Sequence, residues 1–253
     1  MYARRIILKR AAAIPISVIL ADPMLARAVG AALETVTITT VDGKSISGAL
    51  ARPEKMPAPA IVLIHEWWGL NDQIKAVAAD LSRHGYVALA IDLYDRKVAT
   101  TRDDARSLMR AVDPDIATDT LKSWIAWVRA HEATINKLGT IGWCFGGAWS
   151  LAASIDAFVD ATVVYYGNIN RSAHELAKLK GPVLGHFATH DTWINEAMVN
   201  GFEAEMAKAG KTFITHWYEA DHAFANPSSA RYDEANAKLS WERTNAFLAK
   251  QLF

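Results

Sequence analysis

The 253-residue sequence contains a single cysteine, Cys144. One cysteine excludes an internal disulfide bond and a zinc site built from several cysteines, so its thiol is either an inert core group or a reactive one. The sequence also has no excess charge, because 27 lysines and arginines balance 27 aspartates and glutamates. This balance gives no indication of a nucleic-acid or anionic-membrane partner. Any electrostatic function is therefore expected to be local to a pocket.

Metal-ligand patterns and long apolar runs are scarce as well. The eight histidines are scattered along the chain, and we predict neither a metal site nor an organic cofactor. The apolar stretch at residues 11–21 is shorter than the roughly 20 residues that span a bilayer. No repeat, linker or low-complexity segment interrupts the sequence that follows.

Residues 1–28 are typical of an export signal rather than of a folded domain. A basic start, in which Arg4 and Arg5 resemble a twin-arginine consensus, precedes the apolar stretch and a small-residue cleavage site. Cleavage is expected after Ala28, which would leave a bacterial periplasmic or secreted protein of residues 29–253 without stable membrane association. The alternatives are an amphipathic first helix or an uncleaved membrane anchor.

The rest of the sequence alternates strand patterns with helix patterns. Short apolar runs suit strands buried on both faces, and apolar residues at three-to-four spacing indicate helices. Strict alternation predicts an α/β domain over residues 29–253, with a mostly parallel central sheet and helices on both faces. The expected strands are 35–40 and 45–51 (a hairpin), 60–64, 86–91, 140–142, 161–166, 182–187 and 213–218; the expected helices are 74–83, 101–111, 116–131 (capped by Asp115), 148–155, 196–209 and 232–248.

One motif joins an expected strand to an expected helix around the cysteine. The sequence Gly142-Trp143-Cys144-Phe145-Gly146-Gly147 fits a nucleophile elbow, G-x-nucleophile-x-G. The elbow places its nucleophile on a tight, strained turn, which requires small residues on either side. The N–H of Phe145, at the helix N-terminus, is then a candidate oxyanion donor. The alternative is a glycine-rich turn with a buried cysteine.

A nucleophile needs a base, and the base needs an orienting acid. Asp191 and His222 each follow an expected strand, and in the α/β-hydrolase fold the chain order is nucleophile, acid, histidine. Asp221 competes for the acid role, but it is the direct neighbour of His222; His190 competes for the base role, but it breaks the chain order. Taken singly, His222 is also consistent with a loop histidine and Asp191 with a turn aspartate.

The loop after residues 60–64 is the second place where this fold supplies an oxyanion donor. We assign that donor to the backbone N–H of Trp67. Glu66 lies beside aromatic residues at the same strand end, which is an unusual place for a solvated carboxylate. It is either part of a structural salt bridge or faces the nucleophile. The neighbouring Trp68 is a candidate for the wall of an apolar substrate pocket.

Taken together, these residues resemble the dienelactone hydrolase family, from residue 34 to the end of the sequence. The resemblance implies that Cys144 is the nucleophile, His222 the base and Asp191 its orienter, and that Glu66 helps to take the thiol proton. The matching segments are His65-Glu66-Trp67-Trp68-Gly69, Asp92-Leu93-Tyr94, the elbow, Asp191 and Asp221-His222-Ala223-Phe224.

The resemblance also concerns the substrate. Two arginines hold the substrate's carboxylate in this family; Arg96 matches one, but Asn226 occupies the position of the other. An asparagine cannot replace the charge of an arginine fork. The substrate is thus expected to be a small ester or lactone, with or without a carboxylate, and the protein is expected to be a monomer.

Two other functions remain open from the sequence. One is a catalytically silent member of the fold that binds a ligand through the same pocket. The other is a thiol-based redox protein, in which Cys144 is oxidised reversibly to a sulfenic acid. Loss of turnover with a thiol that still labels distinguishes the first, and indifference to loss of Asp191 distinguishes the second.

Overall fold

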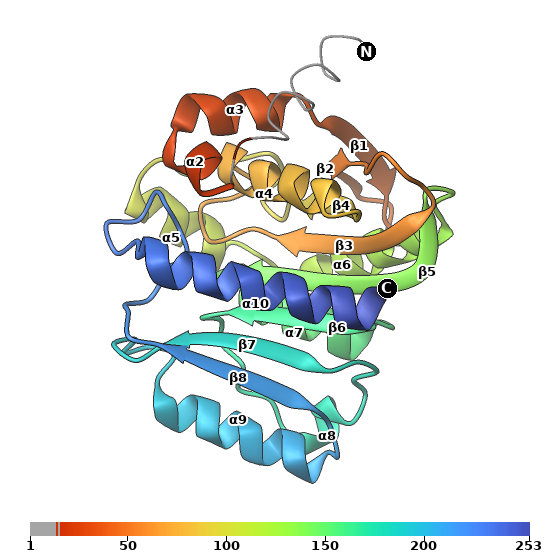
Figure 1. Ribbon diagram of the computed structural model, residues 1–253. Coiled ribbons are helices and arrows are strands. Elements are labelled where there is room, and N and C mark those ends of the chain that lie inside the picture. The colour runs from red at the N-terminus through yellow and green to blue at the C-terminus, as the bar shows by residue number, and fades with distance from the viewer. Residues whose placement is uncertain (1–13, 15) are drawn as a thin grey trace. The chain divides into compact units, whose positions relative to one another are not determined.

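The computed structural model describes residue 14 and residues 16–253 (Figure 1). These residues divide into two compact units, the first ending at Lys137 and the second comprising Leu138–Phe253. Arg4, Arg5 and the rest of the basic start of the predicted export signal lie outside the described residues.

The strands of the first unit follow the order β1-β2-β4-β3. Strands β1 (Glu34–Thr39) and β2 (Ser45–Ala51) form the predicted antiparallel hairpin, and β2 also pairs antiparallel with β4 (Val87–Ile91). Strand β3 (Ala58–Ile64) is parallel to β4. Every residue of β3 and β4 is buried, as expected for strands that are covered on both faces.

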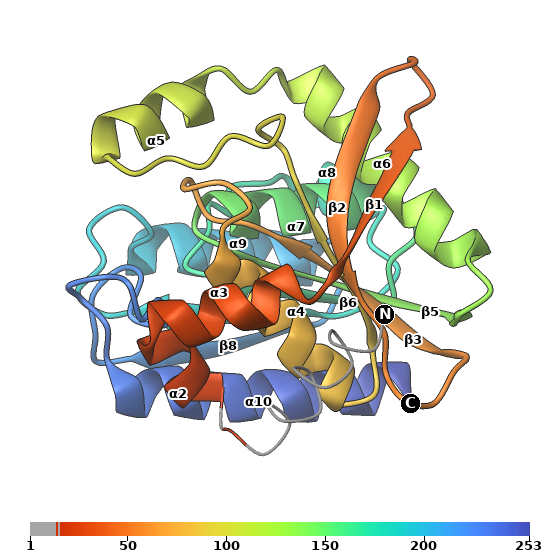
Figure 2. The same ribbon diagram turned by 90° about the horizontal axis from the view of Figure 1, so that it is seen from above.

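Helices cover both faces of these strands. Helix α4 (Asp72–Arg83) packs on β4 and β2, whereas α6 (Pro114–Ala130) contacts β3 from the opposite face (Figures 1 and 2). The shorter α5 (Arg102–Arg110) precedes α6. The cap predicted for α6 is wrong: Asp113, not Asp115, accepts the N–H groups of the first turn, because the helix begins at Pro114, two residues earlier than expected.

Two helices that we did not predict occupy the second half of the expected export signal. They are α2 (Ile16–Ala21) and α3 (Pro23–Ala31), and α3 packs against α4. The Asp22 carboxylate caps α3 by accepting the N–H of Met24 at 2.8 Å. The predicted cut after Ala28 falls inside α3; export and cleavage stay predictions.

All strand pairs of the second unit are parallel. They join β5 (Thr134–Trp143, which enters this unit at Leu138), β6 (Ala161–Tyr165), β7 (Val183–Ala188) and β8 (Phe213–Tyr218), in that order. The prediction of a mostly parallel arrangement is confirmed. Since parallel strands end at the same edge, the segments that follow β5, β7 and β8 begin close together. These segments carry Cys144, Asp191 and His222.

Helices also lie on both faces of the second unit. Helix α7 (Phe145–Asp156) packs on β6, and α9 (Glu196–Lys208) contributes Val199 and Phe202 to a core shared with Phe187 of β7. The long α10 (Glu234–Leu252) contacts β6 and β7 from the opposite face (Figures 1 and 2). The short α8 (Ala173–Leu176) was not predicted.

Candidate active site

Cys144 lies at the turn between β5 and α7 with a backbone that L-residues rarely adopt. Its φ is 51° and its ψ is −115°, and it is the N-cap residue of α7. Its N–H donates to the carbonyl of Tyr165 at 2.9 Å, which ties the turn to the end of β6. Such strain persists only where the surrounding structure fixes it, and it commonly marks functional sites.

The turn also explains why glycine stands at position 142. A Cβ atom there would lie only 2.0 Å from the carbonyl oxygen of Gly146, so no side chain fits. The close approach of strand and helix required by the predicted elbow is therefore present.

His222 lies between Cys144 and Asp191 and is within hydrogen-bonding distance of both. The Nε2 atom of His222 is 3.2 Å from the Cys144 sulfur, and its Nδ1 atom is 2.6 Å from Oδ2 of Asp191. Asp191 and His222 are buried, whereas Cys144 is partly exposed. The imidazole thus bridges the thiol and the carboxylate, which is the arrangement that nucleophilic catalysis needs.

The second oxygen of Asp191 fixes this carboxylate in place. Its Oδ1 accepts the N–H groups of Trp193 at 2.9 Å and Ile194 at 3.1 Å. Burial alone would raise the pKa of Asp191, but the hydrogen bond and charge of His222, together with the two N–H groups, outweigh burial and lower the pKa. The carboxylate therefore stays ionised and holds the proton of the imidazole on Nδ1.

The two competing residues lie away from this arrangement. Asp221 is exposed, although it is the direct neighbour of the buried His222. His190 is exposed as well, and its backbone N–H donates to the carbonyl of Ala220 at 3.0 Å. Consecutive residues after β8 thus point in different directions, as the sequence reasoning required.

Three residues that we did not predict surround His222. The buried Tyr166 ring lies 5.0 Å from the imidazole, and the Trp193 ring, 62% exposed, packs edge-on at 5.2 Å. The guanidinium of Arg231 sits over the Trp193 ring at 5.6 Å and donates to the His222 carbonyl at 3.5 Å. Arg231 makes no ion pair with the part of the chain that the structure describes. Only the placement of Trp193, two residues after Asp191, could have signalled this cluster.

Asn226 shapes the loop that carries His222. Its Oδ1 accepts the N–H of Ser228 at 2.8 Å, and its own N–H donates to the carbonyl of Ala223 at 3.1 Å. The side chain is buried, with 3% of the residue exposed. These bonds give the side-chain oxygen a structural task in a turn.

The other predicted site residues belong to the first unit. Glu66 is buried and follows β3, while Trp67 and Trp68 are half-buried and contact each other edge-on at 5.1 Å. The loop is tied down by backbone bonds: Gly69 N–H donates to the Glu66 carbonyl at 3.2 Å, and the Trp68 carbonyl accepts the N–H of Ala99 at 2.9 Å.

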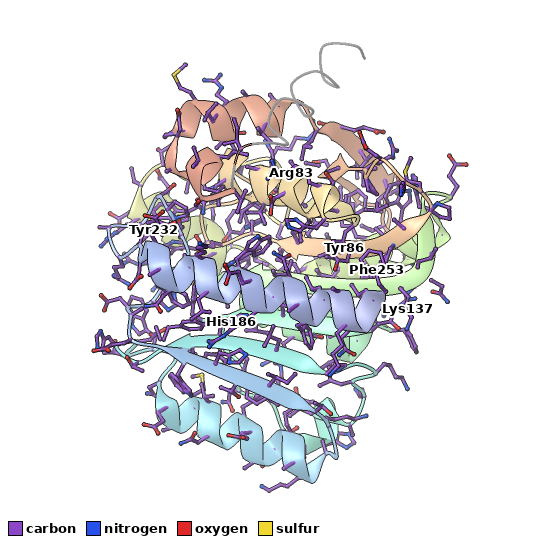
Figure 3. The ribbon with its side chains drawn as sticks, viewed as in Figure 1. Arg83, Tyr86, Lys137, His186, Tyr232 and Phe253 are labelled. Atoms are coloured by element: carbon purple, nitrogen blue, oxygen red, sulfur yellow. The ribbon has the colours of Figure 1, made fainter. Side chains whose placement is uncertain are left out.

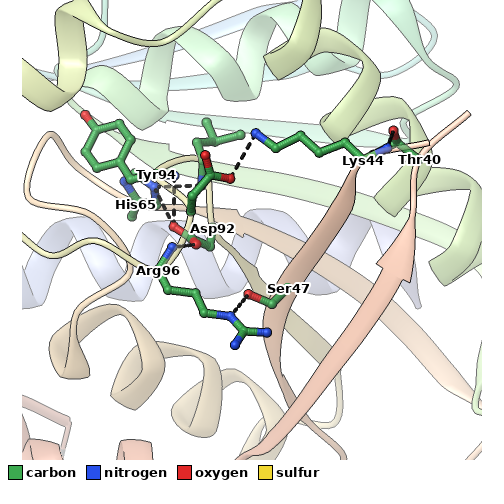
Figure 4. A network of polar contacts seen from close by, with 9 residues as sticks. Thr40, Lys44, Ser47, His65, Asp92, Tyr94 and Arg96 are labelled. Atoms are coloured by element: carbon green, nitrogen blue, oxygen red, sulfur yellow. Dashed lines mark hydrogen bonds and ion pairs between the residues drawn. The ribbon is translucent and has the colours of Figure 1, made fainter. Parts of the chain in front are cut away.

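Arg96 lies in the turn after β4, where polar contacts fix the backbone (Figure 4). The Asp92 carboxylate accepts the N–H of Tyr94 at 2.9 Å and the N–H of Arg96, whose φ is 67°. The exposed Arg96 side chain donates through Nε to Ser47 Oγ at 3.3 Å (Figure 4). Its two terminal nitrogens point away from Ser47 (Figure 4).

A buried histidine joins this turn to the loop after β3. Burial lowers the pKa of His65, so it is neutral; its Nδ1 donates to the Glu66 carbonyl at 2.5 Å, and its Nε2 accepts the N–H of Leu93 at 3.1 Å (Figure 4). The segments around Glu66 and Asp92 thus share a structural hydrogen-bond network.

Neither metal clusters nor membrane-spanning helices occur among the described residues. Within residues 16–253, no three histidine, cysteine, aspartate or glutamate side chains converge to hold a metal ion. No helix in the same range is long and apolar enough to cross a bilayer.

Comparison with known proteins gives consistent matches. Residues 46–252 match the dienelactone hydrolase family. The chain is 30% identical over 231 residues to a carboxymethylenebutenolidase of Pseudomonas putida, covering 85% of this chain and 96% of that protein. It is 26% identical to carboxymethylenebutenolidase 1 of Cupriavidus pinatubonensis over 224 residues, covering 85% and 95%.

A solved structure shows the same fold. It is a dienelactone hydrolase-like promiscuous phosphotriesterase from metagenomic libraries, with a TM-score of 0.79 and 20% identity, covering 87% of this chain and 99% of that one. At this identity the likeness concerns the fold alone, and it confirms the predicted α/β-hydrolase fold.

Proposed function

The chain belongs to the dienelactone hydrolase family and is therefore a carboxylic-ester hydrolase, and we propose that it cleaves its ester or lactone with Cys144 as nucleophile, His222 as general base and acid, and Asp191 as orienting group. The observation that carries this proposal is the contact of His222 Nε2 with the Cys144 sulfur at 3.2 Å, combined with its Nδ1 contact to Asp191 at 2.6 Å.

Acylation begins with the proton of the thiol. Because Asp191 keeps a proton on Nδ1, Nε2 presents its lone pair to Cys144 and takes the thiol proton as the sulfur attacks the carbonyl carbon. The carbonyl π electrons move to oxygen, and the N–H of Phe145 at the start of α7 is assigned to hold this oxyanion. As the tetrahedral intermediate collapses, Nε2–H gives its proton to the leaving alkoxide.

Deacylation repeats these steps with water. The base His222 takes a proton from water, the hydroxide attacks the thioester carbonyl, and the thiolate leaves and regains its proton from Nε2–H. A lactone differs from an open ester in one respect: its leaving alcohol stays attached to the acyl group. Water must therefore attack before the ring closes again, and the ready hydrolysis of thioesters favours this order.

The predicted roles of the first unit complete the proposal. Trp67 N–H is assigned as the second oxyanion donor, Glu66 as a carboxylate that helps to take the thiol proton, Trp68 as part of the substrate pocket, and Arg96 as a cation for the substrate. Two observations support these roles. Glu66 is buried, and Arg96 donates to Ser47 through Nε rather than through its two terminal nitrogens. Asn226 holds the loop of His222 through Ser228, so its contribution to binding is secondary.

Arg231 is the second cation that we assign to the substrate. It lies against the backbone of His222 and over Trp193, and it has no ion-pair partner in the described chain. A guanidinium in this situation can pair with a carboxylate through two parallel hydrogen bonds. We therefore propose a small carboxylate-bearing lactone or ester as the preferred substrate class.

A matched substrate pair tests this assignment. We expect wild-type protein to hydrolyse both a neutral lactone and its carboxylated counterpart, with a higher kcat/KM for the carboxylated one. Arg231→Met should lower kcat/KM for the carboxylated lactone roughly tenfold more than for the neutral one, because a charge-assisted hydrogen bond contributes about 1.5–3 kcal/mol. Steady-state kinetics on both substrates measures the difference.

The control is Arg171→Met, which removes a guanidinium whose Nη1 donates to the carbonyl of Asn170 in the loop before α8. In this variant, the ratio of kcat/KM for the carboxylated lactone to kcat/KM for the neutral lactone should be the same as in wild type. If Arg231→Met lowers kcat/KM equally for both substrates, Arg231 does not bind the substrate carboxylate. If no ester or lactone is cleaved while iodoacetamide still labels Cys144 rapidly, the ligand-binding or redox function is correct instead.

A further inference from the structure

A chain of buried polar side chains lies between the strands of the second unit and α10. His186 of β7 is fully buried; its Nδ1 is 2.8 Å from the Tyr218 hydroxyl, and its Nε2 is 2.9 Å from Thr244 Oγ1. The Tyr165 hydroxyl is 2.7 Å from the same Thr244 oxygen. Figure 3 shows His186 between β7 and α10. None of these four side chains has a role in the hydrolysis described above.

His186 is neutral in this environment. Burial lowers the pKa of its imidazole well below the ordinary range, and the charges of His216 and Arg243 lower it further. His216 lies beside it on β8, with ring centroids 5.8 Å apart. A neutral imidazole has one donor and one acceptor nitrogen, so the bonds on its two sides must run in opposite senses.

Arg243 lies beside the Tyr218 end of this chain. Its guanidinium is over the Tyr218 ring, with the central carbon 5.3 Å from the ring centroid. His186 therefore uses one ring nitrogen toward Tyr218 and the other toward Thr244.

Thr244 joins His186 to Tyr165. Its hydroxyl oxygen is within hydrogen-bonding distance of both His186 Nε2 and the Tyr165 hydroxyl, so one side chain of α10 connects β6 with β7.

Three members of this chain also hold the active-site backbone through their carbonyl oxygens. The Tyr165 carbonyl accepts the N–H of Cys144 at 2.9 Å, and the His186 carbonyl accepts the N–H of Tyr166 at 2.8 Å. The Tyr166 ring packs on His222.

The third of these backbone hydrogen bonds lies close to Asp191 in the sequence. The Tyr218 carbonyl accepts the N–H of Thr189 at 2.9 Å, two residues before Asp191. The same strand ends therefore carry the buried chain on their side chains and the catalytic loops on their backbones.

We propose that Thr244 of α10 is a positioning residue for the reaction, which through Tyr165 and His186 fixes the ends of β6, β7 and β8 and hence the alignment of Cys144 with His222. Apolar packing alone tolerates small shifts of strands, whereas hydrogen bonds between buried groups weaken steeply when their distances and angles change. A nucleophile misplaced by about 1 Å can lose about 10²-fold in rate. This inference rests on the proposed hydrolysis.

The matched pair Thr244→Val and Thr244→Ser tests it. Valine keeps the shape of the side chain but leaves His186 Nε2 and the Tyr165 hydroxyl without their partner, whereas serine retains the hydroxyl. We expect Thr244→Val to lower kcat at least about tenfold with KM changed less than about twofold, and to shift the pH profile of iodoacetamide alkylation of Cys144. Thr244→Ser should restore both to near wild type.

Thr162→Val is the control for a purely structural effect. Thr162 is also a buried threonine of the second unit, but its hydroxyl donates to Ser154 Oγ of α7 at 2.7 Å, outside the chain at α10. It should lower the melting temperature while kcat and the alkylation profile stay as in wild type. Thr244→Val behaving like Thr162→Val would overturn the proposal.

A second variant and a measurement that needs no turnover complete the test. If Thr244→Val does not fold, Tyr218→Phe removes the hydroxyl that pairs with His186 Nδ1 on the other side of the imidazole, and it should lower kcat in the same way. The alkylation profile needs no turnover. A wild type that hydrolyses nothing would defeat the proposed function, and an unshifted profile in a folded Thr244→Val would separately defeat the positioning role.

Discussion

Replacing His222 by alanine is expected to lower kcat for ester hydrolysis by about 10³- to 10⁵-fold, because the imidazole serves both half-reactions. In acylation it takes the thiol proton across 3.2 Å, and in deacylation it activates water from the same nitrogen. The buried carboxylate of Asp191 holds the other ring nitrogen of His222 at 2.6 Å. Steady-state kinetics at neutral pH measures the loss.

His190→Ala is the matched control, since His190 is an exposed histidine that lies between β7 and Asp191. Its side chain is outside the hydrogen-bonded arrangement, so kcat should stay within about twofold of wild type. The rate of iodoacetamide alkylation provides a second readout: it should fall at neutral pH in His222→Ala and stay unchanged in His190→Ala. Retention of full turnover in a folded His222→Ala would exclude His222 as the base.

Replacing Gly142 by alanine should have the largest effect on folding. The added methyl carbon would lie 2.0 Å from the Gly146 carbonyl oxygen and 2.3 Å from its carbon, and both are backbone atoms that cannot rotate away. The strand and the helix would have to separate at the strained Cys144. We expect a loss of at least about 3 kcal/mol in the free energy of unfolding, measured by urea denaturation, and loss of turnover in any folded fraction.

Gly201→Ala provides the opposite result on the same assay. Gly201 lies inside α9, and nothing lies within 4 Å of the position its Cβ would take. Alanine is the better helix former by about 1 kcal/mol, so this variant should be slightly more stable than wild type. Similar stability of Gly142→Ala and wild type would mean that the elbow tolerates a side chain, contrary to the close approach in the structure.

The order of strands and helices in the two units was predictable because each carries its own local signal. Apolar runs such as β3 and β4 are buried on both faces, and the hairpin of β1 and β2 surrounds an Asp-Gly turn. The contact of Cys144 with His222 was predictable for a related reason: parallel strands end at one edge, so residues following β5, β7 and β8 meet there.

Other features depend on contacts that leave no periodic pattern. The helices α2 and α3 were missed because their residues are also typical of an export signal, and packing on α4 is a tertiary contact. The cap of α6 was placed two residues late because Asp113 and Asp115 are equivalent as residue types. Only the position of Pro114, which suits a first helical residue, separates them.

The surroundings of the site were the least predictable part. Arg231 reaches the backbone of His222 only through the fold of the loop held by Asn226, and its position in the sequence matches no motif. Thr244 lies in the middle of α10, where a threonine has no distinguishing local signal. Its contact with His186 becomes visible only when helix and strands are packed.

Turnover of a p-nitrophenyl ester and of a lactone by Cys144→Ala, beside wild-type protein of equal melting temperature, tests the central claim most directly. If Cys144 is the nucleophile, the variant keeps its fold and its ligand contacts, but kcat falls by at least about 10³-fold on both substrates. If Cys144→Ala hydrolyses either substrate at the wild-type rate, the reaction does not pass through a thioester, and the assignment of Cys144, His222 and Asp191 as a catalytic triad is wrong.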